Sequence, residues 1–143
     1  MSHDTHHHHK ESFITKYIFS QDHKMIARQY LITAIFMGAI GIALSALFRL
    51  KLGWPDDKFP ILESILGSDA APDGLLDSNW YLGLVTLHGT IMVFFVLTGG
   101  LSGTFSNLLI PLQVGARDMA SGLLNMISYW LFFLSSVLMA SSL

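Results

Sequence analysis

Charged residues fall in clusters along this chain, and three long uncharged stretches lie between them. Residues 30–48, 78–116 and 119–143 contain no Asp, Glu, Lys or Arg. An α-helix rises about 1.5 Å per residue and needs about 20 apolar residues to cross about 30 Å of hydrocarbon. Each stretch is long enough for one crossing, so the pattern predicts an all-α, polytopic transmembrane helix bundle with three helices in this chain.

The residues that flank these stretches set the expected boundaries. We expect transmembrane helices at 28–50, 80–113 and 119–143, an N-terminal arm at 1–27, a loop at 51–79 and a turn at 114–118. The middle stretch could hold two short crossings with a turn at Gly99 and Gly100, but no polar residue marks such a turn. Within the loop, Pro60 and Gly67 bracket an apolar segment that predicts a short helix at 60–66. We expect its apolar face to lie on the membrane surface or on a neighbouring subunit.

Composition narrows the class of protein. Hydrophobic residues make up 52% of the chain and charged residues 13%, about half the charged fraction of a typical soluble domain. The 8 basic and 10 acidic residues leave no positive excess, so we expect no nucleic-acid partner. The absence of cysteine excludes disulfides, thiolate metal sites and thiol catalysis. The class that remains is a membrane protein.

The N-terminus carries histidines at positions 3 and 6–9. We interpret this run as an expression tag or a native solvated tail. A metal site is the least favoured alternative, because such a run has no fixed geometry. A signal peptide is not expected, because the first apolar run begins only at residue 30 and no small-residue cleavage site is present.

Basic residues are distributed unevenly between the two ends of the predicted helices. With three crossings, the N-terminal arm and the second connection share one side of the membrane, and that side holds Lys10, Lys16, Lys24, Arg28 and Arg117. The other side holds Arg49, Lys51 and Lys58. This bias predicts a cytoplasmic N-terminus.

Small residues recur at spacings that suit close helix packing in lipid. The first predicted helix carries Ala34, Gly38, Gly41 and Ser45, and the second carries Gly99, Gly100 and Gly103. Three helices alone form a thin bundle, so we expect further helices from other chains or from a continuation of this one.

His88 interrupts the apolar pattern of the second predicted helix. It lies seven residues after Tyr81, about 10 Å inside the helix. An ionisable side chain at that depth is costly and points to function. Neutral imidazole is a common axial ligand of haem iron, and an interhelical hydrogen bond or a proton relay remains as an alternative.

Four segments of the sequence resemble subunit I, the catalytic subunit of the haem-copper oxidases. They are Asp-His-Lys at 22–24, LHGTIMVFF at 87–95, NLLIPLQVGARDMA at 107–120 and NMISYW at 125–130. They occur in order across residues 17–143, with the spacing of the family. The resemblance implies a subunit of about twelve helices, of which this chain carries the first three. The copper ligands and the second haem-binding segment would then lie in the remainder of the subunit.

The resemblance also implies roles for two residues at a cofactor. His88 matches an axial ligand of the low-spin haem iron, and the haem would be haem A. Arg49 matches an arginine that contacts the edge of that haem. The alternative for Arg49 is a cation that extends its side chain to the membrane interface.

Three further residues match positions of the so-called D proton pathway in the A-type branch of the family. Asp118 matches the carboxylate at its cytoplasmic mouth, and Asn107 and Asn125 match polar steps along it. Asn125 follows Asp118 by seven residues, so on one helix both would share a face, with Asn125 about 10 Å deeper. The alternatives are a helix cap for Asp118 and interhelical hydrogen bonds for the two asparagines.

Two departures from related oxidases bear on the electron donor and the origin. Where quinol-oxidising relatives have polar or ionisable residues, this chain has Ile40, Leu44, Trp80 and Gly83. An apolar face cannot hydrogen-bond a quinone, so we expect cytochrome c as the donor. Lys51 replaces the glutamate of an outer cation site in mitochondrial members, which favours a bacterial origin and argues against that site.

We therefore expect the N-terminal part of a proton-pumping oxidase subunit, with no catalytic residue of its own, that reduces oxygen only within the complete complex. The expected location is the bacterial inner membrane. The expected partners are subunits II and III, a cytochrome c, a respiratory supercomplex and the lipid bilayer. The alternatives are subunit I of a quinol oxidase and a non-catalytic helical assembly subunit.

Overall fold

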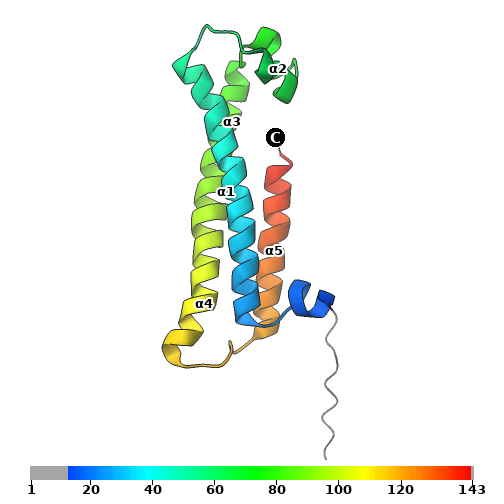
Figure 1. Cartoon of the computed structure of the whole chain (residues 1–143), viewed down its shortest axis with the longest axis vertical. Coiled ribbons are helices and arrows are strands. Elements are labelled where there is room, and N and C mark those ends of the chain that lie inside the picture. The colour runs from blue at the N-terminus through cyan, green and yellow to red at the C-terminus, as the bar shows by residue number, and fades with distance from the viewer. Residues whose placement is uncertain (1–12, 143) are drawn as a thin grey trace, which may run out of the picture.

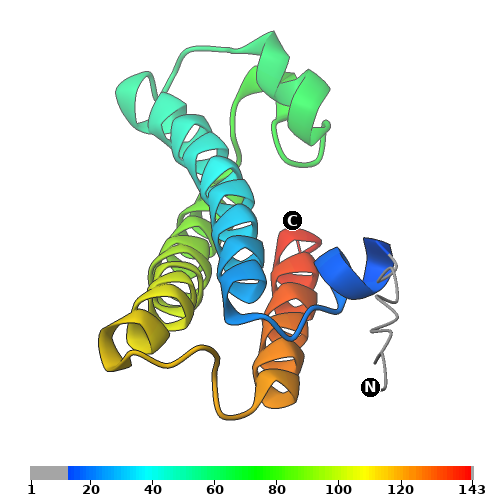
Figure 2. The same cartoon turned by 60° about the horizontal axis from the view of Figure 1, so that its bottom comes forward.

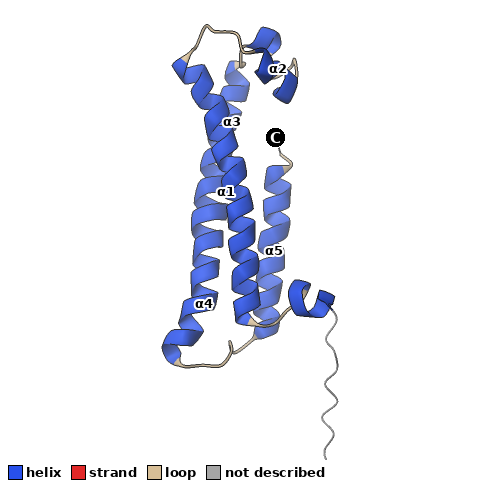
Figure 3. Ribbon diagram, in the orientation of Figure 1, coloured by secondary structure: helices blue, strands red, loops and turns tan. Residues whose placement is uncertain are grey.

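The structure is a computed structural model that describes residues 13–142. Three long helical rods stand side by side, with short helices at both ends (Figure 1). Helices and loops make up the whole of the described chain (Figure 3). The elements are η1 (Ile14–Ile18), α1 (His23–Gly53), α2 (Pro60–Leu66), η2 (Pro72–Gly74), α3 (Ser78–Thr90), η3 (Ile91–Ser102), α4 (Gly103–Val114) and α5 (Gly122–Ala140). The histidines predicted as a tag or tail lie outside the described residues.

Three helices are long and apolar enough to cross a membrane, which confirms the predicted fold class. They are His23–Gly53, Ser78–Val114 and Gly122–Ala140. The second is a single rod that joins α3, η3 and α4 end to end. Gly99 and Gly100 lie inside this rod, so the alternative of two short crossings with a turn there is wrong.

The helix ends differ from the predicted ones where capping residues intervene. α1 begins at His23, five residues before the predicted start, because the Asp22 carboxylate accepts a hydrogen bond from the Lys24 amide at 3.2 Å and caps the helix. α5 begins at Gly122, three residues after the predicted start, because Ser121 occupies the cap position. The capping residues therefore determine where α1 and α5 begin, and the start of the uncharged run does not.

α1 is the central rod of the bundle. Figure 2 shows it between the second rod and α5, and it packs against α3, η3, α4 and α5. The first apolar core joins Met37 and Leu44 of α1 to Leu84 and Ile91 of the second rod. A smaller cluster of Ile26, Tyr30 and Tyr129 joins α1 to α5.

The loop between α1 and α3 folds back over the ends of these two helices. Leu62 of α2 is 2% exposed and packs in the first core with Ala71 and Leu76 of the same loop. Ile61 and Ile65 of α2 remain exposed. The expectation that the apolar face of this short helix lies entirely on the membrane or a neighbour is therefore wrong for Leu62, which this chain buries itself.

The second rod is wound more widely in its middle, and α1 approaches it closely there. Ile91–Ser102 is a π-helix, the form closed by i→i+5 hydrogen bonds. A Cβ added to Gly100 would lie 2.6 Å from the Phe95 carbonyl oxygen and would collide with the Cβ of Ala34 on α1. Only glycine fits at this crossing, as the small-residue pattern predicts.

Replacing Gly100 should therefore destabilise the bundle. We expect Gly100→Ala to lower the free energy of unfolding by about 1–3 kcal/mol, the usual cost of overpacking. Gly83→Ala is the matched control, because a Cβ there would meet no described atom within 4 Å beyond its chain neighbours and the backbone of its own helix, and alanine favours a helix by up to about 1 kcal/mol. Thermal unfolding of the membrane complex measures both. Equal stability of the two variants would contradict the packing at Gly100.

Candidate functional site

His88 lies on α3 and points at the backbone of α1. Its Nδ1 is 2.8 Å from the carbonyl oxygen of Gly41. A carbonyl can only accept a hydrogen bond, so Nδ1 carries the proton and donates it. The neutral tautomer then leaves the Nε2 lone pair free. The His88 ring also meets the Phe48 ring edge to face, with 5.5 Å between centroids.

This arrangement fits a histidine that binds a metal. Metal-ligating histidines usually donate their other ring N–H to a carbonyl or carboxylate, which fixes the tautomer and the ring orientation. The Gly41 carbonyl does this for His88. The interhelical hydrogen bond considered as an alternative is thus present at Nδ1, and it leaves Nε2 able to bind iron.

Arg49 lies near the far end of α1, eight residues and about 12 Å beyond Gly41 along the helix axis. Its side chain is exposed and forms no ion pair within residues 13–142. Its neighbour Phe48 contacts His88, but the described contacts do not join Arg49 to His88 directly. Arg49 therefore lies in the same half of the bundle as His88. Its charge is not paired with a carboxylate of residues 13–142.

Asp118 lies in the connection between α4 and α5 and is not part of a helix. The predicted alternative that it caps the third helix is wrong, because the Ser121 hydroxyl accepts from the Leu124 amide instead, at 3.4 Å. The expectation that Asp118 and Asn125 share a helix face fails for the same reason. Asp118 Oδ1 instead accepts from the Met119 amide at 2.8 Å and lies 3.0 Å from Nδ1 of His23.

His23 is the residue of this site that the sequence reasoning missed. It is 2% exposed at the first turn of α1, and its Nδ1 also lies 3.5 Å from Oδ1 of Asp22. The segment Asp22-His23-Lys24 is one of those that carry the family resemblance, and nothing local in it indicates a partner 95 residues away. A cavity of about 430 Å³ opens beside this group and is lined by Lys16, Phe19, Ser20, Gln21, Asp22, Met25 and Asp118.

The contacts of Asp118 keep it ionised. The hydrogen bond from the Met119 amide, and after it the one from His23, lower the pKa of Asp118 from its ordinary value of 3.8. Its side chain is 55% exposed. Asp118 is therefore a carboxylate at the surface of the bundle, in contact with solvent on one side and with a buried imidazole on the other.

Asn107 and Asn125 form a direct bridge between α4 and α5. Nδ2 of Asn125 donates to Oδ1 of Asn107 at 2.5 Å and lies 3.1 Å from Sδ of Met119. Asn107 is buried, and its Nδ2 donates to the Gly103 carbonyl at 2.7 Å. The interhelical hydrogen bond predicted as an alternative for these residues is present.

The polar contacts continue beyond the asparagines between α5 and α1. The Ser128 hydroxyl donates to the Asn125 carbonyl at 2.7 Å, and the Tyr30 hydroxyl lies 3.2 Å from Ser128 Oγ. Because Ser128 has one hydroxyl hydrogen, Tyr30 is the donor of the second bond. About one turn further along α1 from Tyr30, the hydroxyls of Thr33 and Tyr129 form a buried hydrogen bond of 3.2 Å.

These hydroxyl residues were also missed, although a signal exists for one of them. Ser128 follows Asn125 by three residues, a spacing that places both on one face of a helix. Tyr30 and Thr33 lie on another helix, so only the fold brings them to Ser128 and Tyr129. We call these hydrogen-bonded residues the polar row. It begins near Asp118 at the bundle end, continues to the α1–α5 interface, and consists of Asn107, Asn125, Ser128, Tyr30, Thr33 and Tyr129.

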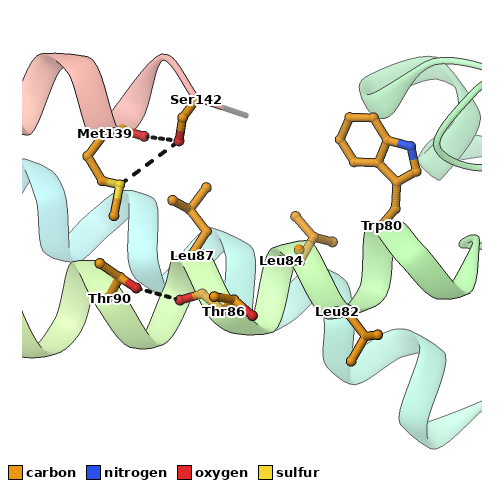
Figure 4. Close-up of a pocket in the computed structure, with 9 residues that line it drawn as sticks. Trp80, Leu82, Leu84, Thr86, Leu87, Thr90, Met139 and Ser142 are labelled. Atoms are coloured by element: carbon orange, nitrogen blue, oxygen red, sulfur yellow. Dashed lines mark hydrogen bonds between the residues drawn. The ribbon is translucent and has the colours of Figure 1, made fainter.

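A mostly apolar cavity of about 480 Å³ lies between α3 and the end of α5. Figure 4 shows Trp80, Leu84 and Leu87 of α3 facing Met139 and Ser142. The hydroxyls of Thr90 and Ser142 already donate to backbone carbonyls, those of Thr86 at 2.9 Å and Met139 at 2.8 Å. These two hydroxyl hydrogens are therefore already engaged.

Residues 25–143 match the family described as Cytochrome C and Quinol oxidase polypeptide I. The chain belongs to this family. It is 42% identical over 134 residues to the alternative cytochrome c oxidase subunit 1 of Bradyrhizobium diazoefficiens, covering 94% of this chain and 20% of that protein. It is 32% identical over 151 residues to cytochrome c oxidase subunit 1 of Cereibacter sphaeroides, covering 96% of this chain and 26% of that protein. No solved structure matches the chain.

The chain is thus a multi-pass membrane protein of the respiratory haem-copper oxidase family, whose members bind haems and copper. It spans about a fifth of the length of the relatives it matches. A probable quinol oxidase subunit 1 of Staphylococcus aureus is 36% identical over 128 residues, covering 86% of this chain and 17% of that protein. Family membership therefore leaves the electron donor open between cytochrome c and quinol.

The Asp118 contacts should depend on pH. Because the pKa of Asp118 is lowered in the folded chain, the stabilisation is complete above its ordinary value of 3.8 and is lost as pH falls through the lowered pKa. We expect the Met119 amide to lose protection from hydrogen exchange in that acidic range. Asp118→Asn is the control, since its amide does not titrate there. Equal acid loss of protection in both proteins would contradict a role of the carboxylate.

Proposed function

We propose that this chain is the N-terminal part of the catalytic subunit of a proton-pumping terminal oxidase, and that His88 is an axial ligand of its low-spin haem. The observation that carries the proposal is the bond from His88 Nδ1 to the Gly41 carbonyl, which leaves Nε2 unprotonated for iron. When bound, the haem, which we take to be haem A, supplies one-electron transfer between the donor and the oxygen-reducing site.

Within this proposal, the chain's own residues orient the ligand and set its surroundings. The Gly41 carbonyl fixes the tautomer of His88, and the Phe48 ring covers one side of the imidazole. Arg49 would place a positive charge at the edge of the haem, where charge-assisted hydrogen bonds are strong. Copper and the second haem would be held by other parts of the subunit.

We further propose that Asp118 is the mouth of a proton pathway that continues through Asn107 and Asn125. Its exposed carboxylate can exchange protons with water, and the asparagines are the next polar groups inside the bundle. Ser128, Tyr30, Thr33 and Tyr129 extend the polar row inward. Ordered water completes such paths where direct hydrogen bonds end.

We propose cytochrome c as the electron donor. A quinone head group needs hydrogen-bond donors, whereas Leu44 is buried in the apolar core and Trp80 and Gly83 line a mostly apolar cavity. The alternative is subunit I of a quinol oxidase. Oxygen uptake by the purified complex, with reduced cytochrome c or quinol as the only donor, decides between them.

The complete protein would sit in a bacterial inner membrane with its N-terminus in the cytoplasm. Lys16, Lys24, Arg28 and Arg117 at the Asp118 end support this orientation. The expected partners are subunits II and III, a cytochrome c and a respiratory supercomplex. If the chain were a non-catalytic assembly subunit instead, the purified complex would show no low-spin haem band that depends on His88.

Replacing His88 tests the haem assignment. We expect His88→Ala to abolish the low-spin haem absorption band of the assembled complex. His88→Asn should lose the band as well, although its side-chain N–H can still reach the Gly41 carbonyl. Thr90→Ala on the same helix is the control, because its hydroxyl only bonds its own helix at Thr86. An intact band in a folded, inserted His88→Ala complex would refute the assignment.

Replacing Asp118 tests the proton pathway. Asn preserves the shape and the hydrogen-bond acceptor but carries no exchangeable carboxyl proton, so Asp118→Asn should slow oxygen uptake about 10²-fold or more. Haem content should be unchanged. Asp22→Asn is the matched control, since Asp22 lies beside the same His23 at 3.5 Å and Asn caps a helix as well as Asp. Full turnover and pumping by Asp118→Asn in proteoliposomes would leave Asp118 a structural residue.

A further inference from the structure

We propose that the groove between α1 and α4, at the bundle end that carries Asp118, binds one anionic phospholipid. The groove has a volume of about 300 Å³ and is lined by Lys24, Ala27, Arg28, Leu31, Thr104 and Leu108. Its two cations lie on the first two turns of α1, Leu31 lies about one turn further along the same helix, and α4 supplies Leu108 opposite the cations. The groove therefore has a basic mouth and apolar walls that continue inward, which matches the two parts of a lipid.

The mouth of the groove carries two cations that have no carboxylate partner among residues 13–142. Lys24 and Arg28 are four residues apart on α1 and so share one face. Both are exposed, and neither forms an ion pair with a carboxylate of the described chain. The nearest acid in sequence, Asp22, directs its carboxylate at the Lys24 amide and at His23. A phosphate diester suits such a pair, because Arg binds two of its oxygens and Lys adds a point charge.

The interior of the groove offers an apolar wall for an acyl chain. Leu31 and Leu108 are 39% and 37% exposed, so both present surface that the described part of the chain does not cover. Ala27 forms a small, buried floor between them. The Thr104 hydroxyl donates to the Gly100 carbonyl at 2.6 Å, so its hydrogen is already bonded. An acyl chain would meet carbon atoms along this wall.

Charge favours a lipid over another protein helix as the occupant. An apolar helix laid over this groove would remove Lys24 and Arg28 from water without a counter-charge, which is costly. An anionic head group supplies the counter-charge and still lets acyl carbon cover the two leucines. Basic residues between transmembrane helices at a membrane face are a common setting for such lipids. The inference does not depend on the oxidase proposal, because it uses neither His88 nor Asp118.

Lipid binding by the purified complex tests the site. The complex is stripped of lipid, titrated with phosphatidylglycerol or phosphatidylcholine, and followed by native mass spectrometry. We expect one phosphatidylglycerol to bind in preference to phosphatidylcholine. Lys24→Gln/Arg28→Gln should weaken that binding about thirtyfold, about fivefold for each charge. Lys16→Gln/Arg117→Gln removes two cations at the same end of the bundle outside the groove and should leave this binding unchanged.

Two further arms separate a lipid site from a simple anion site. Leu108→Trp narrows the groove while both cations remain, so it should also weaken phosphatidylglycerol binding. Excess inorganic phosphate should not displace the lipid, because phosphate uses only the basic mouth. Equal affinity for the two lipids, equal loss in both double variants, an unaffected Leu108→Trp variant or displacement by phosphate would each overturn the proposal. So would a groove in the complex that takes up no lipid because another helix covers it.

Discussion

The near contact between the backbones of α1 and the second rod determines the positions of the functional side chains. Because Gly100 has no side chain, the Cβ of Ala34 can pack directly against its backbone. Gly103 lies against the ring of Tyr30, and a Cβ at Gly103 would lie 2.6 Å from that ring. Because lipid provides no hydrophobic drive between helices, association depends on such close packing. At this separation the His88 ring spans from α3 to the Gly41 carbonyl, and wider spacing of these two helices would break that bond. The Asn107–Asn125 bond joins α4 to α5 and depends on the spacing of those helices instead.

Most polar groups inside the bundle make their hydrogen bonds locally or across one interface, although within residues 13–142 Gln29 Oε1 and Trp130 Nε1 are buried without a partner. Asn107 uses both ends of its amide, and the hydroxyls of Thr33 and Tyr129 satisfy each other. Buried polar groups in a membrane interior are expensive unless they are paired in this way. The polar row between α4, α5 and α1 thus stabilises the bundle and also makes its interior polar. In the proposed proton pathway, the same side chains that hold the helices together would carry the function.

The sequence predicts the three crossings well, because charge is excluded from hydrocarbon and the uncharged stretches are long. It predicts the ends poorly, since Asp22 and Ser121 cap their helices outside the pattern of apolar residues. His88 stands out because no Asp, Glu, Lys, Arg or other His lies in its stretch. His23 does not, because its partner Asp118 is distant in sequence and only the fold joins them. The wide winding of η3 carries no periodicity signal that distinguishes it from an α-helix.

The Ser128 hydroxyl gives the polar row a direction. Its single hydrogen is directed at the Asn125 carbonyl, and the Tyr30 hydrogen is in turn directed at Ser128. In this orientation both O–H groups point from the interior towards the Asp118 end, so a hydrogen ion taken up at that end cannot move inward through them until both hydroxyls have turned. For inward relay through this row, rotation of the Ser128 and Tyr30 hydroxyls would be a separate step that comes before the hop.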